Sequence, residues 1–318
     1  TIRTVSQEVT RVAGHLTIED GLKLEGATTE SVLALSGNLY MHGTGPFIPA
    51  TPFSIIFEKE QSQTFELNPN LASFHEIIIT ANTTVMVIGG DNGNTLQLGS
   101  EGGGGLAIDA GGKLMLKKNH LVIAGKGILN ANNQTGHVGF TGSEFSLRSA
   151  TSINSNLYTV PGADSIRRLN VELTGAGRLA LHRSLFVTEY VNPTHGYIES
   201  NGYLSLVSTR AGTAQLRKSE GAGSIIGKVV FQRFIPRGKQ TRYLSFPVSG
   251  ASVSELQKSI PVTGKFNGAN TGNGLSSAPS LHYYDDVAGG WVPYPVASNA
   301  GTLQPGKGYS LFIHDGSR

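Results

Sequence analysis

Residues 106–123 read LAIDAGGKLMLKKNHLVI, and this stretch sets the expectation for the whole chain. It contains three apolar alternations, at Leu106–Ile108, Leu114–Leu116 and Leu121–Ile123. An alternation with a period of two is typical of a half-buried β-strand. The intervening residues are few and rich in glycine and asparagine, so they leave no room for crossover helices between parallel strands. We therefore expect successive short strands that turn corners.

The same alternation recurs along the first two thirds of the chain. Further copies are Leu16–Ile18, Leu22–Leu24, Leu33–Leu35, Leu39–Met41, Leu96–Leu98, Leu179–Leu181 and Leu204–Leu206. A Gly-x-apolar-x-apolar unit occurs at Gly37–Met41, Gly112–Leu116 and Gly202–Leu206. The segment Phe74–Ile79 also resembles Ser165–Val171, with Ile77 matching Leu169 at a shift of 92 residues. Self-similarity built from short strands predicts a solenoid, in which each coil buries its inward residues against its neighbours.

The predicted fold is all-β, with a parallel β-helix over residues 1–227 followed by a smaller antiparallel β domain over residues 228–318. We expect the coils to begin near residue 12 and to number about ten, with roughly 20 to 25 residues each. Each inward Leu or Ile should contribute about 1.5–3 kcal/mol through burial. Stacking can then offset the entropy lost by ordering so many turns.

The composition agrees with a turn-rich β protein. The chain has 318 residues, of which 42 are Gly and none is Cys. Glycine spread through the whole chain disfavours helices, and the absence of cysteine excludes disulfides and thiolate metal sites. No apolar run approaches the length of a membrane span, so we expect none. The chain starts at Thr1 without a leader sequence and ends soon after a strand-like Tyr309–Ile313, so we expect it to be a truncated piece of a longer polypeptide.

The composition changes after Gly227. Residues 228–318 contain the only Trp, Trp291, and seven of the 13 prolines. Longer strands are expected at Lys228–Ile235, Arg242–Pro247, Leu281–Tyr284 and Tyr309–Ile313, joined by Pro- and Gly-rich links. This pattern predicts a separate β-sandwich-like module.

Three blocks of this second region resemble a known module. They are Gly227–Pro236, Arg242–Val248 and Pro305–Ile313, and they are similar to a module of large surface proteins of the Bacteroidetes. In that family the module follows Gly/Thr/Asn-rich β-helical repeats, and the protein ends in a sorting domain for type IX secretion. The resemblance implies an adhesin-like, secreted cell-surface protein with a role in gliding motility, attachment or biofilm. It also implies an extracellular location and export by the secretion machinery, through a sorting domain that this sequence lacks.

Motifs for cofactors and metals are weak. The segment Ala222–Val229 is close to a phosphate-binding loop, but Val229 replaces the required Ser/Thr and the following residues are strand-like. Gly89–Asn94 faintly resembles a calcium-binding turn but does not repeat. The nine histidines have no metal-ligand spacing. We therefore expect no cofactor, no metal site and no catalytic residue.

The distribution of charge suggests one candidate surface. Formal net charge is +3, and the first 80 residues carry −5 while the remainder carries +8. If the coils align the basic residues, a positive stripe could bind acidic glycans, extracellular DNA or other surface polymers through weak, salt-sensitive contacts. The alternative is an ordinary solvated face. The candidate polyanion-binding residues are Lys117, Lys118, Arg167, Arg168, Arg233, Arg237, Lys239 and Arg242.

Two further expectations complete the prediction. Dense Lys/Arg blocks are missing, so we expect no specific nucleic-acid partner. Asp164-Ser165-Ile166 resembles the O-glycosylation sequon of exported Bacteroidetes proteins, which makes Ser165 a candidate glycosylation site. The predicted function is an extracellular structural and adhesive scaffold without catalysis. The alternatives are a polysaccharide-binding module and a polysaccharide-degrading β-helix, although the acids form no tight sequence cluster of the kind such an enzyme needs.

Overall fold

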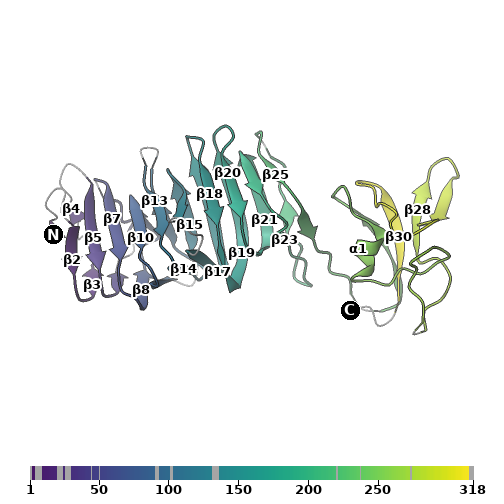
Figure 1. Cartoon of the computed structure of the whole chain (residues 1–318), viewed down its shortest axis with the longest axis horizontal. Coiled ribbons are helices and arrows are strands. Elements are labelled where there is room, and N and C mark those ends of the chain that lie inside the picture. Colours follow the sequence, from purple (N-terminus) through teal and green to yellow (C-terminus); the bar gives the residue numbers. More distant parts are fainter. Residues whose placement is uncertain are drawn as a thin grey trace. The chain divides into compact units, whose positions relative to one another are not determined.

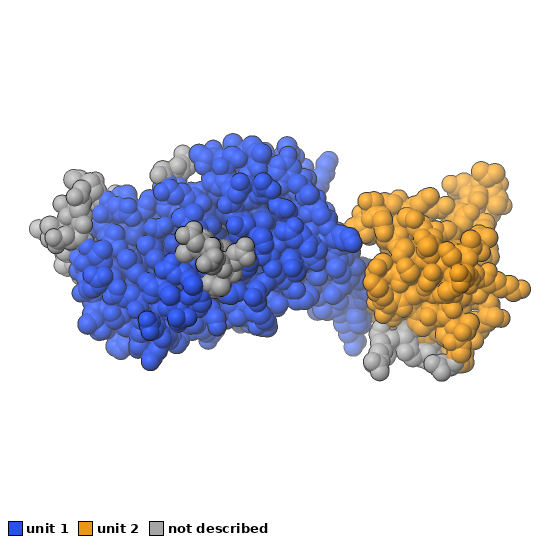
Figure 2. Space-filling model, viewed as in Figure 1, with its two compact units in different colours: residues 1–234 blue, residues 235–318 orange. Residues whose placement is uncertain are grey.

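The computed structural model describes residues 2–3, 9–19, 24–25, 30–43, 45–49, 51–89, 93–100, 103–130, 136–219, 221–236, 238–272 and 274–314. Strands hold 54% of the residues and helix 2%, so the chain is all-β as predicted. It divides into two compact units, residues 1–234 and residues 235–318 (Figure 2).

Unit 1 is a parallel β-solenoid of about eight turns (Figure 1). The strands of each coil lie on three faces, and each face is a stack of parallel strands from successive coils. The first face stacks β2 (Val9–Val12), β5 (Ser31–Leu35), β7 (Phe53–Phe57), β10 (Glu76–Ile79), β13 (Gly105–Ile108) and β16 (Ile128–Asn130). A four-stranded sheet that contacts β16 follows, with β18 (Asn154–Leu157), β20 (Arg178–Leu181), β22 (Tyr197–Glu199) and β25 (Ser224–Ile226).

The other two faces belong to one 14-stranded sheet with a branch. The second face stacks β3 (Leu16–Ile18), β6 (Leu39–Met41), β8 (Ser62–Leu67), β11 (Thr84–Gly89), β14 (Lys113–Leu116), β17 (His137–Ser149), β19 (Thr159–Leu173), β21 (Leu185–His195), β23 (Leu204–Leu206) and β26 (Val229–Phe231). The third face contains β9 (Leu71–Phe74), β12 (Thr95–Leu98), β15 (His120–Ala124) and β24 (Gln215–Leu216). The faces join because β17 runs from one to the other, pairing first with β14 and then with β15. A separate short pair joins β1 (Ile2–Arg3) to β4 (Leu24–Glu25).

The opening stretch, residues 106–123, forms a single coil. Its three alternations are β13, β14 and β15, one on each face, so each short strand turns a corner as predicted. The three copies of the Gly-x-apolar-x-apolar unit also lie in one sheet, as β6, β14 and β23. The match of Ile77 to Leu169 is wrong, because Ile77 lies on the first face in β10 whereas Leu169 lies in β19.

The coils are fewer than predicted, and the coil that ends at β13 is longer than predicted. Ile55 pairs with Ile77, and Ile77 pairs with Leu106, so one coil has 22 residues and the next has 29. About eight turns result, rather than about ten. The loop before β13 accounts for the added length, and loops at solenoid corners vary in this way because they do not enter the core.

The interior of the solenoid is a continuous column of aliphatic and phenylalanine side chains. Phe53, Phe57 and Phe65 are fully buried, and the ring of Phe65 lies 6.0 Å from both Phe57 and Phe74. Rings at such distances interact favourably in tilted and edge-on arrangements. Every coil therefore depends on the coils beside it for burial.

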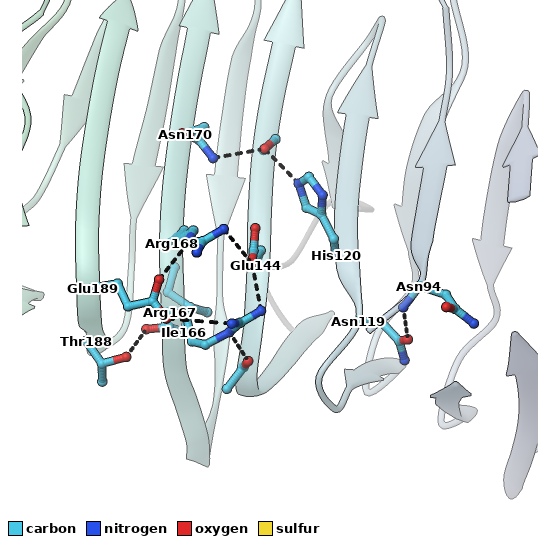
Figure 3. Close-up of polar contacts among 12 residues, drawn as sticks. Asn94, Asn119, His120, Glu144, Ile166, Arg167, Arg168, Asn170, Thr188 and Glu189 are labelled. Carbon is cyan, nitrogen blue, oxygen red and sulfur yellow. Dashed lines mark hydrogen bonds and ion pairs between the residues drawn. The ribbon is translucent and has the colours of Figure 1, made fainter. Parts of the chain in front are cut away.

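The corners are held by buried amides and by glycine. The Asn119 side chain accepts a hydrogen bond from the Asn94 backbone N–H at 3.1 Å (Figure 3). It also donates a hydrogen bond to the Val87 carbonyl at 3.2 Å. Gly99 has a φ of +77°, and a Cβ there would collide with the backbone carbonyl of Ala124 in the next coil. Only glycine fits that position without moving backbone.

The boundary between the units lies later than predicted. Residues 228–234 belong to the solenoid, because Val229–Phe231 forms β26 and pairs in parallel with β23. The expected antiparallel strand Lys228–Ile235 is therefore incorrect, and unit 2 starts at Ile235 rather than at residue 228.

Unit 2 is built on one antiparallel sheet with the order β27-β30-β28-β29. Its strands are β27 (Gln240–Ser245), β28 (Leu281–Asp285), β29 (Gly290–Pro293) and β30 (Gly308–Ile313). The inner face is covered by the short helix α1 (Val253–Gln257) and by residues that follow it, including Val262 and Phe266. Within the described part of unit 2 there is one sheet, so the sandwich-like expectation is replaced by a sheet covered by a helix and loops.

Candidate functional site

The predicted basic residues lie on several elements of both units. Lys117 and Lys118 are exposed in the turn between β14 and β15, whereas Arg167 and Arg168 lie in the middle of β19. Arg233 is exposed at the end of unit 1, and Lys239 is exposed in unit 2. Arg237 lies outside the described residues. Arg167 and Arg168 share the same two acidic partners, and Lys117 and Lys118 lie two coils away from them along the solenoid.

A β-bulge places Arg167 and Arg168 on the same side of the strand. Ile166 pairs with Ser143 and Arg168 pairs with Glu144, so Arg167 is an extra residue in the ladder. The ladder between β19 and β21 is shifted at the same point, between Ile166 and Arg168. A bulge re-aims side chains in this way, so both arginines point outward between the buried Ile166 and Leu169.

Both arginines are paired with acids from adjacent coils (Figure 3). Arg167 contacts Glu144 at 2.7 Å and Glu189 at 3.6 Å, and Arg168 contacts the same two carboxylates at 3.2 Å and 2.6 Å. Arg167 also donates from Nε to the carbonyl of Gly142 at 3.1 Å. The hydrogen bond to Glu189 is the main reason that the pKa of Arg168 is raised further. These contacts join three successive coils. Because the two positive and two negative formal charges cancel, the cluster offers little net charge to a polyanion.

A neighbouring group extends the network along β21. The guanidinium of Arg217 lies 3.5 Å above the ring of Tyr190, and that of Arg168 lies 5.5 Å from the same ring. Such cation–π contacts stabilise by about 0.5–1 kcal/mol at exposed positions. Arg217 is therefore another basic residue whose charged group contacts a side chain of the protein itself.

His120 lies beside the arginine–glutamate cluster. Its Nε2 is 2.9 Å from the Ser146 hydroxyl, which also accepts a hydrogen bond from Asn170 at 3.2 Å (Figure 3). Desolvation by burial lowers the pKa of His120, and Glu144 opposes that shift while Arg148, Arg168 and Arg167 add to it. His120 is therefore neutral at pH 7, and its contacts link consecutive coils.

The candidates in unit 2 and at Ser165 take similarly structural positions. Arg242 is half-buried in β27, and its Nε is buried with no hydrogen-bond partner among the described residues, so it does not belong to an exposed stripe. Ser165 is half-buried in β19 and is paired on both sides, with Thr141 and with Phe186.

The weak cofactor motifs have structural roles where they are described. The segment Ala222–Val229 contains β25, a turn at Gly227 and the start of β26, so a strand follows where a phosphate loop needs a helix. His182 stacks on Tyr158 at 4.6 Å, and His137 meets the same ring edge-on at 6.3 Å. Across the described ranges no group of three His, Asp or Glu is placed to hold a metal ion. Asp91 and Asn92 of the calcium-like turn lie outside those ranges.

An aromatic cluster on unit 2 was not predicted. Tyr243 of β27, Tyr284 of β28 and Trp291 of β29 are 74%, 44% and 44% exposed. Trp291 stacks with Tyr243 at 5.6 Å and meets Tyr284 edge-on at 5.5 Å. The sequence offers one signal, the alternation of Tyr243 between the half-buried Arg242 and Leu244, but only the strand order brings Tyr243 and Trp291 together.

Comparisons with known proteins identify no relative. No family model, no curated protein and no solved structure matches the chain. Among the described residues, no helix has the length and apolar character needed to cross a membrane.

Proposed function

We propose that this chain is a non-catalytic, extracellular structural and adhesive scaffold of a cell surface. The observation that carries the proposal is that the core and the polar surface clusters of unit 1 hold neighbouring coils together. Aliphatic and phenylalanine residues fill its interior, and the polar clusters on its surface bind adjacent coils to one another. A solenoid in which each coil supports the next suits a stiff spacer, because its stability is a sum over neighbouring interfaces.

The surface location is supported by the resemblance of three blocks, Gly227–Pro236, Arg242–Val248 and Pro305–Ile313, to a module of Bacteroidetes surface proteins that use type IX secretion. The resemblance therefore supplies the location, and the solenoid supplies the mechanical role.

The proposal is tested on intact cells of the source organism. An antibody against the purified chain should label unpermeabilised cells, and deletion of the gene should reduce attachment to a solid surface. Labelling only after lysis, or unchanged attachment in the deletion strain, would reject the extracellular adhesive role. A parallel assay for reducing ends and unsaturated products on acidic and neutral polysaccharides tests the enzyme alternative, since any turnover by the pure chain would contradict a non-catalytic scaffold.

A further inference from the structure

The outward face of the sheet in unit 2 carries an arrangement that the scaffold role does not require. The strand register places Tyr243, Ser310, His282 and Pro293 in one row across the four strands. Tyr284 and Trp291 are paired in the next row. Side chains in alternating positions of these strands face the core, so the two rows share the outer face.

The three aromatic rings are held in place although they are exposed. Trp291 lies between Tyr243 and Tyr284, with centroid distances of 5.6 Å and 5.5 Å. The strand that lies between β27 and β28 presents only Gly308 and Ser310 in these two rows. Small residues there leave room for the rings to reach across the sheet and to support one another. A ring that is already ordered loses little conformational entropy when a ligand binds.

The polar groups of this face are unused by the protein. Within the described part of the chain, the side chains of Tyr243, Tyr284, Trp291, Ser310 and His282 make no hydrogen bond. The face therefore offers phenol, indole, hydroxyl and imidazole groups beside open aromatic surfaces. A ligand that matches it has apolar C–H faces and hydroxyl groups at its edges, which is the chemistry of a pyranose ring.

Charge favours a neutral ligand. The outward positions of the four strands are Thr241, Tyr243, Ser245, His282, Tyr284, Trp291, Pro293, Gly308, Ser310 and Phe312, and His282 is the sole titratable imidazole, acid or strong base in this set. Desolvation by burial lowers the pKa of His282, so the face carries no formal charge at pH 7. An acidic polymer would find no cation on it.

The size of the face disfavours a protein partner. Aromatic side chains bury about 150–250 Å² each, so the exposed parts of these three rings amount to roughly 350 Å². A stable protein interface needs about 800 Å² from each partner. The rings are sufficient for stacking one or two sugars.

We propose that the outward face of the β27-β30-β28-β29 sheet binds a neutral, β-linked polysaccharide by stacking pyranose rings on Tyr243 and Trp291. Sugar hydroxyls then hydrogen-bond to the edges of Tyr284, Ser310 and His282. This inference deepens the proposed adhesive role, on which it rests for the supply of ligand. It concerns unit 2 alone and leaves the spacer role of the solenoid unchanged.

The single tryptophan makes the test specific, because selectively excited tryptophan emission of the whole chain comes from Trp291 alone. The full chain is titrated with the hexasaccharides of β-1,4-glucose, β-1,3-glucose, β-1,4-xylose and β-1,4-mannose. At least one should give a saturable change of emission. The variant Tyr243→Ala keeps the probe and should bind about tenfold more weakly or worse. Trp291→Ala, followed by affinity electrophoresis in a gel containing the same glycan as a polymer, should lose retardation.

Matched controls separate this site from other surfaces. Tyr203 is an exposed tyrosine of the solenoid, 42% accessible, so Tyr203→Ala should leave binding unchanged. Thermal unfolding followed by Trp291 emission establishes that unit 2 of Tyr243→Ala is folded. The proposal is overturned by the absence of saturation with all four glycans at millimolar concentration, by binding that survives both Tyr243→Ala and Trp291→Ala, or by binding only to polygalacturonate or phosphatidylcholine vesicles. Such failure would leave the surface-labelling test of the scaffold untouched.

Discussion

The two units use some of their large aromatic side chains in different ways. In the solenoid, Phe53, Phe57 and Phe65 are fully buried and pack between coils, whereas in unit 2 Tyr243 and Trp291 stack in the open. Charged side chains of the solenoid are also used within the protein, because Arg167 and Arg168 are paired with acids of adjacent coils. A side chain that is buried or paired contributes to the stability of the fold. An exposed and ordered ring contributes little to stability, and we infer that it serves binding.

The largest effect is expected from Phe65→Ala. This side chain is 0% exposed and contacts Phe57 and Phe74, so its removal leaves a cavity between coils. We expect a loss of about 3–5 kcal/mol in the free energy of unfolding. Far-UV circular dichroism, which follows mainly the solenoid strands, should show it in guanidinium, while unfolding followed by Trp291 emission should keep its midpoint.

The conservative variant Phe65→Leu keeps most of the side-chain volume, so its free energy of unfolding should fall less than that of Phe65→Ala. A loss below about 1 kcal/mol for Phe65→Ala would mean that the coils do not depend on each other for burial. The statement that buried aromatic side chains stabilise the solenoid would then be wrong.

A moderate effect is expected from Glu144→Gln. Glu144 contacts both Arg167 and Arg168, and only 14% of its side chain is exposed. Loss of its charge leaves two arginines with Glu189 alone. Because the arginines are 38% exposed, solvent screening limits the expected destabilisation to about 1 kcal/mol. Chemical denaturation measures it.

Glu144→Gln also tests whether the paired acids keep the Arg167–Arg168 cluster from binding a polyanion. Glu144→Gln should increase retention on a heparin column at low salt, since the cluster then carries net positive charge. Glu172→Gln is the matched control, because Glu172 is 57% exposed and meets Arg148 at 4.0 Å. Equal stability losses in the two variants would argue against a special role for the Arg167–Arg168 cluster.

A small effect on stability is expected from Tyr243→Ala. Its side chain is 74% exposed, so removal costs little burial and breaks one stacked pair with Trp291. We expect a loss of about 0.5–1 kcal/mol in the unfolding of unit 2, followed by Trp291 emission. A loss as large as that of Phe65→Ala would show that the exposed rings are structural, and the contrast between the units would disappear.

The sequence predicts the strands better than their partners. Period-two segments such as Leu114–Leu116 identify the solenoid because an alternating strand fixes which side chains point inward. Coil length is not fixed by that pattern, since corner loops such as the one before Leu106 can lengthen without disturbing the core. The boundary fails for a related reason. The composition changes after Gly227, but Val229–Phe231 still pairs with β23.

The candidate sites show the same division. Arg167 and Arg168 are visible as a basic pair, but the bulge that turns both outward and the glutamates that neutralise them depend on register between coils. Tyr243 and Trp291 lie on strands separated in sequence by α1 and long loops, so their stacking follows only from the strand order. Residue type can be predicted from sequence here, whereas proximity cannot.

The smallest effect is the pH dependence contributed by His120. Burial lowers its pKa in the folded state from the ordinary 6.5, so the unfolded chain takes up the proton first as pH falls. The stability contributed by neutral His120 is therefore complete above pH 6.5 and is lost as pH falls through the folded pKa. Glu76 acts in the opposite direction, because burial and Glu30 raise its pKa and favour the folded state as pH falls.

The contributions of His120 and Glu76 are separated by comparing variants rather than by one pH curve. His120→Gln keeps a polar partner for Ser146 and removes the titration. The difference in unfolding free energy between wild type and His120→Gln should favour wild type less at pH 5 than at pH 8, by denaturation followed with circular dichroism. Glu76 is present in both proteins and cancels from the difference. A pH-independent difference would mean that His120 is not desolvated by neighbouring coils, and that the solenoid surface is looser than its hydrogen bonds indicate.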